Sequence, residues 1–336
     1  EELKDGINKK LTPLNFMNAY QVLHFISMYE AILDPKDEPI YNVDIQGDFI
    51  EWFREENRAK ALADEAYKVI DYDDPATVWK RYEDATPHSF ISAKGDTVHQ
   101  VKFPWLKIPL YIWQATGMEF MNIATRQGRG CFECDETGLG KTITVLAHLK
   151  WLQEQAKKNG THFGGAVIVV PSSLIEGWVR KTNMTTDFTV CAVDTNYPVN
   201  GHKADIIIVS YNMLGKHGCW PLAEGVDKQQ RVLVADESHL AKNYDSKRTG
   251  LWLMLSVYAK HSIVLTATPL KNRVLELHPQ LRGTRRLWTE MSLKDFVKTY
   301  DNPDDPGSRG ECAEHLKGIM VRRRMNDVWI NPPKGE

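Results

Sequence analysis

The stretch Asp135-Glu136-Thr137-Gly138-Leu139-Gly140-Lys141-Thr142 decides the fold that we predict for this chain. It lies between a short apolar run, from Cys131 to Cys134, and a helical pattern that begins near Ile143. A strand, a glycine turn and a helix in this order are typical of a loop that binds phosphate. The two glycines let successive backbone N–H groups face one anion, and the N-terminus of the next helix adds partial positive charge. We therefore predict a nucleotide site here.

The predicted nucleotide contacts come from the end of this stretch, namely Thr137, Gly138, Leu139, Gly140, Lys141 and Thr142. Lys141 is expected to reach the β- and γ-phosphates, and the Thr142 hydroxyl is expected to help hold Mg²⁺. Asp135 stands where the general phosphate-loop pattern has glycine. Taken by itself, the stretch leaves one alternative open, which is a glycine-rich turn between a strand and a helix.

Composition limits the classes of protein that fit. At 336 residues, the chain is long enough for two domains, each with its own core. Its 42% hydrophobic and 26% charged residues are ordinary for a soluble globular protein, and its formal charge of −2 means that any nucleic acid must be bound by local contacts. No apolar run approaches the ~18 residues of a membrane span, and no signal peptide opens the chain. We therefore expect an intracellular protein without a membrane partner, in either the nucleus or the cytoplasm. The first residue is Glu1 rather than methionine, which favours a fragment of a longer protein.

Five cysteines, at positions 131, 134, 191, 219 and 312, do not form a disulfide framework in a chain of this length. Cys131 and Cys134 have the spacing of half a metal site, but no second pair accompanies them. Both are therefore interpreted as small buried residues of the strand before the loop.

Residues 1–100 predict a small helical accessory region. Thr12-Pro13 is a good helix start, and apolar residues recur at helical spacing from there to Pro35. Further helices are expected after Asp48 and after Pro75. The region shows no catalytic pattern, so a protein partner bound by these helices is the role that we consider for it.

Residues 101–336 have the pattern of an α/β domain with a mostly parallel sheet and helices on both faces. Short apolar runs without polar alternation are expected of strands that are buried on both faces. The expected strands are 131–134, 166–170, 206–209, 232–234 and 263–265. Ligands of such sheets bind beyond the carboxyl ends of the strands, so the residues after each run are candidates for function.

The run at 232–234 is followed by Ala235-Asp236-Glu237-Ser238-His239. A carboxylate at the end of an apolar strand is the expected second half of a phosphate-loop site. Asp236 would hold Mg²⁺ together with Thr142, and Glu237 would orient and deprotonate the attacking water. The predicted catalytic residues are therefore Lys141, Asp236 and Glu237, with an acidic turn as the alternative.

Hydroxyl groups follow three other strands. Thr266 and Thr268 are expected to report the state of the phosphates through the Asp236–His239 segment, in which His239 is a third coupling residue. The residues that suit the sugar-phosphate oxygens of a nucleic acid are Ser172, Ser173, Ser210 and Tyr211. For all of these, ordinary capping of a strand or helix is the open alternative.

Taken in order, these blocks resemble the Swi/Snf family of DNA translocases, which belongs to the superfamily-two helicase-like ATPases. The loop is close to that family's Asp-Glu-Met-Gly-Leu-Gly-Lys-Thr, in which Asp stands first as in this chain. Residues 169–178, 236–243 and 265–272 look like the family's motifs Ia, II and III, although Ala267 and Lys271 replace the usual glycine and glutamine. Residues 320–323, 327–328 and 332–334 resemble the segment that leads into a second lobe.

The resemblance implies a RecA-like lobe that binds ATP and Mg²⁺, and double-stranded DNA as partner. It also implies a second RecA-like lobe after Glu336, whose arginines complete the site, so little hydrolysis is expected from this chain alone. Gln114, which lies shortly before Gly117, resembles the glutamine that recognises adenine. Ser238 and the Phe296–Tyr300 spacing are similar to the annealing-helicase branch.

We therefore predict the N-terminal region and first motor lobe of an ATP-driven translocase on double-stranded DNA. Candidates for local DNA contacts, with a surface or packing role as the alternative, are Arg282, Arg285, Arg286 and Arg322–Arg324. Two other functions remain open. One is a strand-separating helicase or restriction-type motor, and the other is a DNA- or protein-binding module with a weak ATPase. The intact Lys141, Asp236 and Glu237 count against the second.

Overall fold

The computed structural model describes most of the chain between residues 82 and 328. The described residues are 82, 84–92, 95, 97–126, 130–193, 204–214, 231–269, 274–284, 291–302, 308, 312, 316 and 319–328. The three helices expected before Tyr82 lie outside them, so the helical accessory region and its partner stay predictions. Lys271, Arg285 and Arg286 also lie outside the described residues.

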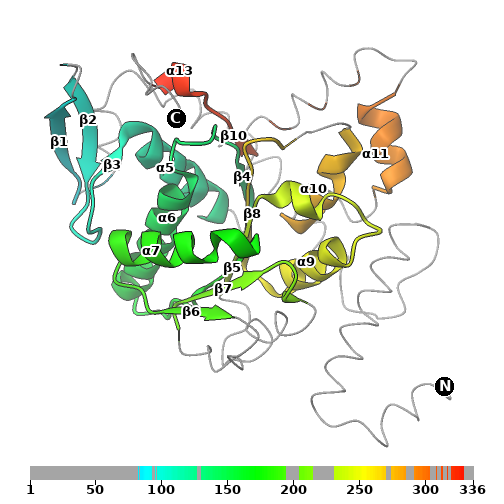
Figure 1. Ribbon diagram of the computed structural model, residues 1–336, viewed down its shortest axis with the longest axis horizontal. Helices are drawn as coiled ribbons and strands as arrows, with labels where there is room; N and C mark the ends of the chain where they lie inside the picture. Colours follow the sequence, from blue (N-terminus) through cyan, green and yellow to red (C-terminus); the bar gives the residue numbers. More distant parts are fainter. Residues whose placement is uncertain are drawn as a thin grey trace, which may run out of the picture.

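Seven strands of the described residues form one sheet, and every neighbouring pair in it is parallel (Figure 1). Across the sheet they follow one another in the order β10-β4-β9-β8-β5-β7-β6. In that order their bounds are Met320–Val321, Cys131–Glu133, His261–Leu265, Val232–Asp236, Ala166–Val170, Ile206–Ser210 and Val190–Val193. The predicted strands are confirmed as β4, β9, β8, β5 and β7, whereas β6 and β10 were not predicted.

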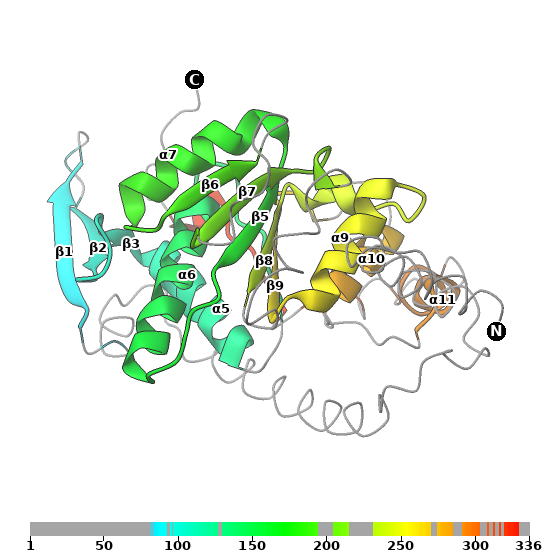
Figure 2. The ribbon, with the colours of Figure 1, turned by 90° about the horizontal axis from the view of Figure 1, so that it is seen from below.

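Helices lie on both sides of the sheet, as predicted. One side carries α5, α6 and α7, and the other carries α9, α10 and α11 (Figures 1 and 2). In that order their bounds are Ile112–Arg126, Lys141–Lys158, Ile175–Thr185, Lys247–Tyr258, His278–Gly283 and Leu293–Tyr300. Among the described residues, four shorter helical segments are η1 (Ser172–Leu174), η5 (Ser238–Ala241), η6 (Val274–Leu277) and α13 (Met325–Val328).

The central strands contribute side chains to two separate cores, because successive residues of a strand point to opposite faces. Ile168 belongs to the core that contains Leu146 of α6 and Trp178 of α7. Its neighbour Val169 belongs to the core that contains Trp252 of α9. Every residue of β5, β7, β8 and β9 is buried, which explains why these strands read as apolar runs without polar alternation.

The described part of the N-terminal region is a small antiparallel sheet rather than a helix. Its strands β1 (Thr86–Ile91), β2 (Thr97–Lys102) and β3 (Leu110–Tyr111) pair in sequence order. Val101 of β2 shares a core with Met118 of α5. The boundary that we expected at residue 100 therefore falls within a strand that packs against the α/β domain.

The described cysteines are all free thiols, and Cys131 and Cys134 are fully buried in the way that the sequence predicts. Within the described ranges, no group of three or more His, Cys, Asp or Glu side chains could hold a metal ion. No helix in the same ranges is both long and apolar enough to cross a membrane.

Two helical glycines provide a test of the packing. A Cβ atom on Gly283 of α10 would lie 1.8 Å from Cη2 of the fully buried Trp252, whereas a Cβ atom on Gly177 of α7 would meet no atom within 4 Å. We expect Gly283→Ala to lower the free energy of unfolding by about 1–3 kcal/mol, because the rigid indole ring must move. Gly177→Ala is expected to raise it by about 0.5–1 kcal/mol, through lower backbone entropy of the unfolded chain.

Denaturant unfolding of the two variants beside the wild type measures both changes. Equal stability of Gly283→Ala and wild type would contradict the close packing of α10 on α9.

Candidate nucleotide-binding site

The predicted phosphate loop connects β4 to α6, and its backbone requires glycine at two positions. Gly138 has φ 97° and Gly140 has φ 90°, which lie in the left-handed region that other L residues rarely adopt. Space is also restricted, since a Cβ atom on Gly140 would lie 2.2 Å from Nε2 of Gln114. The side chains of Glu136 and Thr137 are exposed beside Gly138, so this part of the loop is open to a ligand.

Lys141 and Thr142 open helix α6 directly after the loop. The Lys141 ammonium donates to the main-chain oxygen of Asp135 at 2.6 Å, so its positive charge lies against the loop. The Thr142 hydroxyl accepts a longer hydrogen bond, 3.4 Å, from the ammonium group of Lys181 on α7. Lys141 and Thr142, the residues predicted to bind phosphate and magnesium, thus occupy the first turn of one helix, where the helix dipole adds to the attraction for anions.

Asp236 is the last residue of β8 and is only 7% exposed. Its Oδ2 atom accepts a 2.7 Å hydrogen bond from Nε1 of Trp178, and its Oδ1 atom accepts one of 2.9 Å from the Glu237 amide. Burial raises the pKa of the Asp236 carboxyl above its ordinary value, and the hydrogen bond from Trp178 opposes that rise. Each carboxylate oxygen has a further lone pair for a cation.

Glu237 has φ 49° and ψ 49°, the only positive φ of a residue other than glycine in the described ranges. Such a backbone costs on the order of 1–3 kcal/mol and is typical of functional sites, where the surrounding structure holds it in place. Its carboxylate is partly exposed, and Oε2 lies 3.2 Å from Nδ1 of His239. The strained turn thus presents a carboxylate beyond the end of the strand.

The register of three strands brings the two halves of the site to the same edge of the sheet. Leu265 of β9 pairs with Asp236 of β8 on one side and with Glu133 of β4 on the other. Asp236 and the start of the phosphate loop therefore lie at the carboxyl ends of β8 and β4, with only β9 between them. This arrangement is the one that the sequence predicts for a nucleotide and its magnesium ion.

The oxygen donors of this edge suit magnesium. Thr142 supplies a hydroxyl and Asp236 a carboxylate, and Mg²⁺ prefers such hard oxygen ligands while it keeps several waters and phosphate oxygens. Within the described ranges no three or more His, Cys, Asp or Glu side chains are arranged to hold a metal ion by themselves. The chain's own donors therefore fit an ion that arrives with a nucleotide.

The predicted coupling residues are placed differently from our expectation. Thr266 is fully buried, and its hydroxyl accepts from the Thr268 amide at 3.1 Å, rather than bonding the Asp236–His239 segment within the described residues. The link between the segments passes instead through Gln280, whose Oε1 accepts from the Ser238 hydroxyl at 2.6 Å and whose Nε2 donates to the Pro269 oxygen at 3.4 Å. No sequence pattern marked Gln280, which lies in α10 outside every motif.

The Gln114 side chain is buried against the phosphate loop and does not project from its exposed side. The side chain is 3% exposed, its Nε2 donates to the Leu139 oxygen at 3.2 Å, and its Oε1 accepts from the Tyr111 amide at 3.0 Å. Trp113 adds a second bond to the same Leu139 oxygen, 3.0 Å from its Nε1. In this structure Gln114 holds the loop, and its recognition of adenine stays a prediction.

Two of the four predicted DNA contacts need correction. Ser210 and Tyr211 are each only 3% exposed, and the Tyr211 hydroxyl donates to the Asp236 oxygen at 2.9 Å. The buried side chain therefore supports the end of β8, and burial raises the pKa of its hydroxyl well above the ordinary value. Ser172 and Ser173 are exposed on η1, and their contact with DNA remains a prediction.

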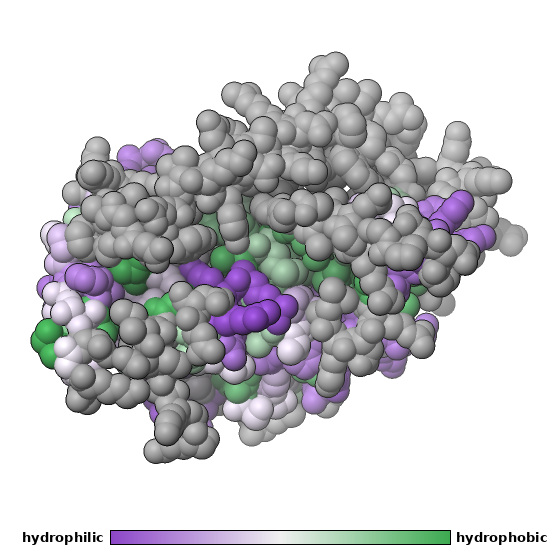
Figure 3. All heavy atoms as spheres, turned by 90° about the horizontal axis from the view of Figure 1, so that it is seen from above, coloured by the Kyte–Doolittle hydropathy of each residue, from purple (hydrophilic) through white to green (hydrophobic). Residues whose placement is uncertain are grey.

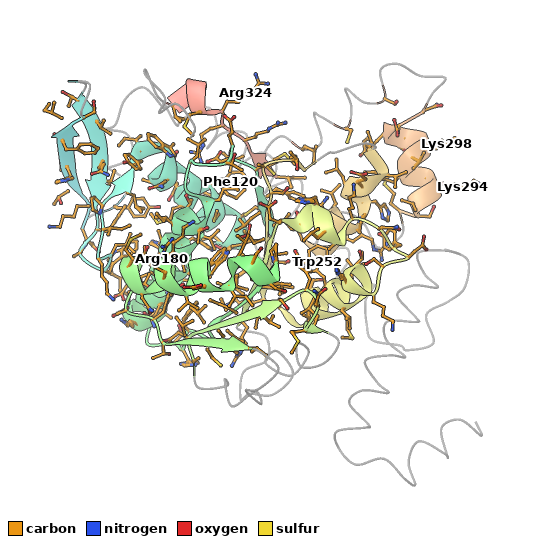
Figure 4. The ribbon with its side chains drawn as sticks, in the orientation of Figure 1. Phe120, Arg180, Trp252, Lys294, Lys298 and Arg324 are labelled. Atoms are coloured by element: carbon orange, nitrogen blue, oxygen red, sulfur yellow. The ribbon has the colours of Figure 1, made fainter. Side chains whose placement is uncertain are left out.

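The arginine candidates divide in the same way. Arg282 and Arg323 are buried, so neither is available to a phosphate backbone. Arg322 and Arg324 are exposed, and Arg324 lies beside α13 at one edge of the molecule (Figure 4). Figure 3 shows the molecule from above, and strongly hydrophilic side chains gather near the centre of that face.

Comparison with protein families identifies the class to which this arrangement belongs. Residues 113–336 match the model of the SNF2-related domain, which is two thirds of the chain. The chain therefore belongs to the SNF2-related domain family, as the motifs predicted.

Two curated relatives show the extent of the likeness. ATP-dependent helicase FUN30 of Saccharomyces cerevisiae is 28% identical over 255 residues, which are 68% of this chain and 22% of that protein. The Drosophila melanogaster homologue of the SWI/SNF-related regulator of chromatin subfamily A containing DEAD/H box 1 is 27% identical over 268 residues, or 73% of this chain and 31% of that protein. The chain thus spans between about a fifth and a third of the length of these relatives.

A solved structure shows the same fold. The Sulfolobus solfataricus SWI2/SNF2 ATPase core in complex with dsDNA superposes with a TM-score of 0.57 at 23% identity, over 68% of this chain and 47% of that one. The sheet and helices described above therefore have the RecA-like fold of that ATPase core.

The hydrogen bond from Trp178 to Asp236 gives a prediction with a matched control. Trp178→Phe removes the Nε1–H donor and leaves a buried carboxylate oxygen with one bond fewer. Trp252→Phe removes the same atoms at a fully buried site, where Nε1 has no hydrogen-bond partner among the described residues. We expect the free energy of unfolding to fall by about 1.5–3 kcal/mol more in Trp178→Phe than in Trp252→Phe, since hydrogen bonds to charged groups contribute about that much. Equal losses in denaturant unfolding would show that the bond does not support Asp236.

Proposed function

We propose that this chain is the first ATPase lobe of a motor that hydrolyses ATP to move along double-stranded DNA. The observation that carries the proposal is the meeting of Lys141, Thr142 and the Asp236-Glu237 pair at one edge of a RecA-like sheet, in a chain of the SNF2-related domain family. The relatives that it resembles are named as ATP-dependent helicases or regulators of chromatin, and the solved structure of similar fold contains dsDNA.

Each residue of the site has a distinct role in phosphoryl transfer. Lys141 exchanges its bond with the Asp135 oxygen for the β- and γ-phosphates, and the loop amides and the α6 N-terminus bind the phosphate oxygens. Thr142 and Asp236 would hold Mg²⁺, which when bound neutralises charge on the phosphates. Glu237, on its strained turn, accepts a proton from the attacking water.

The structure also suggests how a DNA contact would reach this chemistry. Helix α7 follows the exposed Ser172 and Ser173 and carries both Trp178, which donates to Asp236, and Lys181, which donates to Thr142. A shift of η1 and α7 on a DNA backbone would therefore move donors on both candidate magnesium ligands. The exposed Arg322 and Arg324 supply local positive charge on a chain whose formal charge is −2.

The proposed motor needs a second lobe and acts wherever its DNA lies. The second RecA-like lobe would supply the arginines that complete the site, so isolated residues 1–336 would bind ATP with little turnover. A protein that acts on double-stranded DNA would work inside the cell wherever that DNA lies. A strand-separating helicase remains the second candidate, because it would use the same lobe. The intact Lys141, Asp236 and Glu237 disfavour a binding module without turnover.

Two substitutions in the full-length protein separate binding from chemistry. Lys141→Ala is expected to weaken ATP binding by about tenfold or more, because the charged partner of the phosphates is removed. Glu237→Gln is expected to keep ATP affinity within about twofold while turnover falls by about 10²–10⁴, because only the general base is lost.

Titration calorimetry and steady-state phosphate release measure the two quantities. Normal ATP affinity in Lys141→Ala would contradict the phosphate assignment, and undiminished turnover in Glu237→Gln would remove that residue from the catalytic step.

A further inference from the structure

Arg323 is a buried cation that neither the phosphate chemistry nor DNA contact explains. It follows β10 and precedes α13, is 7% exposed, and extends toward the start of the phosphate loop. Its Nε lies 3.0 Å from Oδ1 and 3.1 Å from Oδ2 of Asp135, and its Nη2 lies 2.6 Å from the same Oδ2. The Arg323 amide also donates to Asp135 Oδ1 at 2.9 Å. One aspartate therefore receives four contacts from one arginine.

The remaining guanidinium nitrogen reaches a different element. Nη1 of Arg323 donates to the main-chain oxygen of Trp113 and, at 2.7 Å, to the Thr116 hydroxyl, both in the first turns of α5. Trp113 in turn donates from its indole to the Leu139 oxygen on the far half of the phosphate loop. Arg323 thus connects Asp135, at the start of the phosphate loop, to helix α5, whose Trp113 holds the other half of the loop.

Arg323 lies beside a second buried carboxyl group, that of Glu133. Glu133 is fully buried, and its Oε1 lies 3.5 Å from Arg323 Nη2. Burial and the neighbouring Asp135 raise the pKa of Glu133 well above its ordinary value, and the positive charge of Arg323 opposes that rise. The guanidinium therefore binds Asp135 at 2.6 Å and lies farther, 3.5 Å, from Glu133.

Main-chain hydrogen bonds extend the same connection along the chain. The amides of Phe132, Cys134 and Glu136 donate to the oxygens of Ile319, Val321 and Arg323 at 2.9, 2.8 and 2.9 Å. The Met325 amide donates to the Glu136 carboxylate. Parallel pairing therefore continues past the end of β4 into the phosphate loop, and segment 319–325 forms one wall of that loop.

Asp135 joins this wall to the residue expected to bind phosphate. Its carboxylate accepts hydrogen bonds from the Arg323 guanidinium, and its main-chain oxygen accepts one of 2.6 Å from the Lys141 ammonium. If Lys141 leaves that oxygen to bind a phosphate, Asp135 loses one hydrogen bond. Because Asp135 contacts both Lys141 and Arg323, the change reaches Arg323 through one residue. The coupling path is therefore a short series of direct contacts.

We propose that Arg323 is a positioning residue that couples nucleotide binding on the phosphate loop to the order of segment 319–328. The proposal rests on the proposed function in one respect, namely that a nucleotide binds the loop. Coupling between two equilibria is reciprocal, so a nucleotide must stabilise the segment by as much as the ordered segment strengthens nucleotide binding. A planar guanidinium is required, because a lysine ammonium cannot bind Asp135 through two nitrogens and α5 through a third.

The first test uses the wild-type, full-length protein and needs no variant. Hydrogen–deuterium exchange of peptides covering 319–328 is measured with and without a non-hydrolysable ATP analogue and Mg²⁺. We expect exchange of this segment to slow by about tenfold, as its amides on Asp135 and Glu136 open less often. Binding of the analogue with unchanged exchange in 319–328 would overturn the coupling and leave the proposed function intact. Absence of any binding would overturn both.

The second test compares Arg323→Lys with Arg180→Lys, which alters an exposed arginine of α7 (Figure 4). Affinity for the ATP analogue is measured by calorimetry, and thermal unfolding without nucleotide records any loss of the fold. We expect Arg323→Lys to bind about tenfold more weakly and to lose the nucleotide-dependent protection of 319–328, while Arg180→Lys behaves as wild type. A lower melting temperature with wild-type affinity and protection would show that Arg323 only stabilises the lobe. If Arg323→Lys does not fold, the exchange experiment on the wild type decides alone.

Discussion

The ion pair of Arg323 and Asp135 is the constraint on which the nucleotide site depends. Asp135 is buried at the point where β4 becomes the phosphate loop, and its carboxylate is held by Arg323 from a segment almost two hundred residues later. Breaking such a pair leaves an uncompensated buried charge, which is far more costly than replacing both partners together. The loop that leads to Lys141 is therefore held in place by residues that are distant in the sequence.

The second half of the site depends on strand register rather than on charge. Because Leu265 pairs with both Asp236 and Glu133, a shift of β9 by one residue would displace the carboxylate from the phosphate loop and turn every side chain of β9 to the opposite core. Trp178 and Tyr211 then fix the carboxylate and the main-chain oxygen of Asp236. The strained backbone of Glu237 is tolerated because β8 and η5 hold it from both sides.

The sequence predicts the parts of this lobe that depend on local patterns. Apolar runs identify β5, β7 and β8, and the glycines, Lys141 and Asp236 follow from the requirements of phosphate and magnesium. What could not be predicted depends on burial and on partners far away in sequence. Tyr211 has a hydroxyl at a strand end, as a DNA contact would, but its ring is buried in the core. From the sequence alone, Arg323 looks like one of several surface charges, and Gln280 belongs to no motif. Only the folded chain shows that Arg323 binds Asp135 and that Gln280 binds Ser238.

The claim that this lobe belongs to a motor on double-stranded DNA is tested most directly by ATP hydrolysis in the full-length protein. The rate of phosphate release is measured at saturating ATP with no nucleic acid, with duplex DNA, with single-stranded DNA and with RNA of the same length. Double-stranded DNA is predicted to raise the rate most, by about tenfold or more, with a strong decrease as salt is added because the contacts are made to phosphates. Stimulation by RNA alone, or an equal rate with and without duplex DNA, would contradict it.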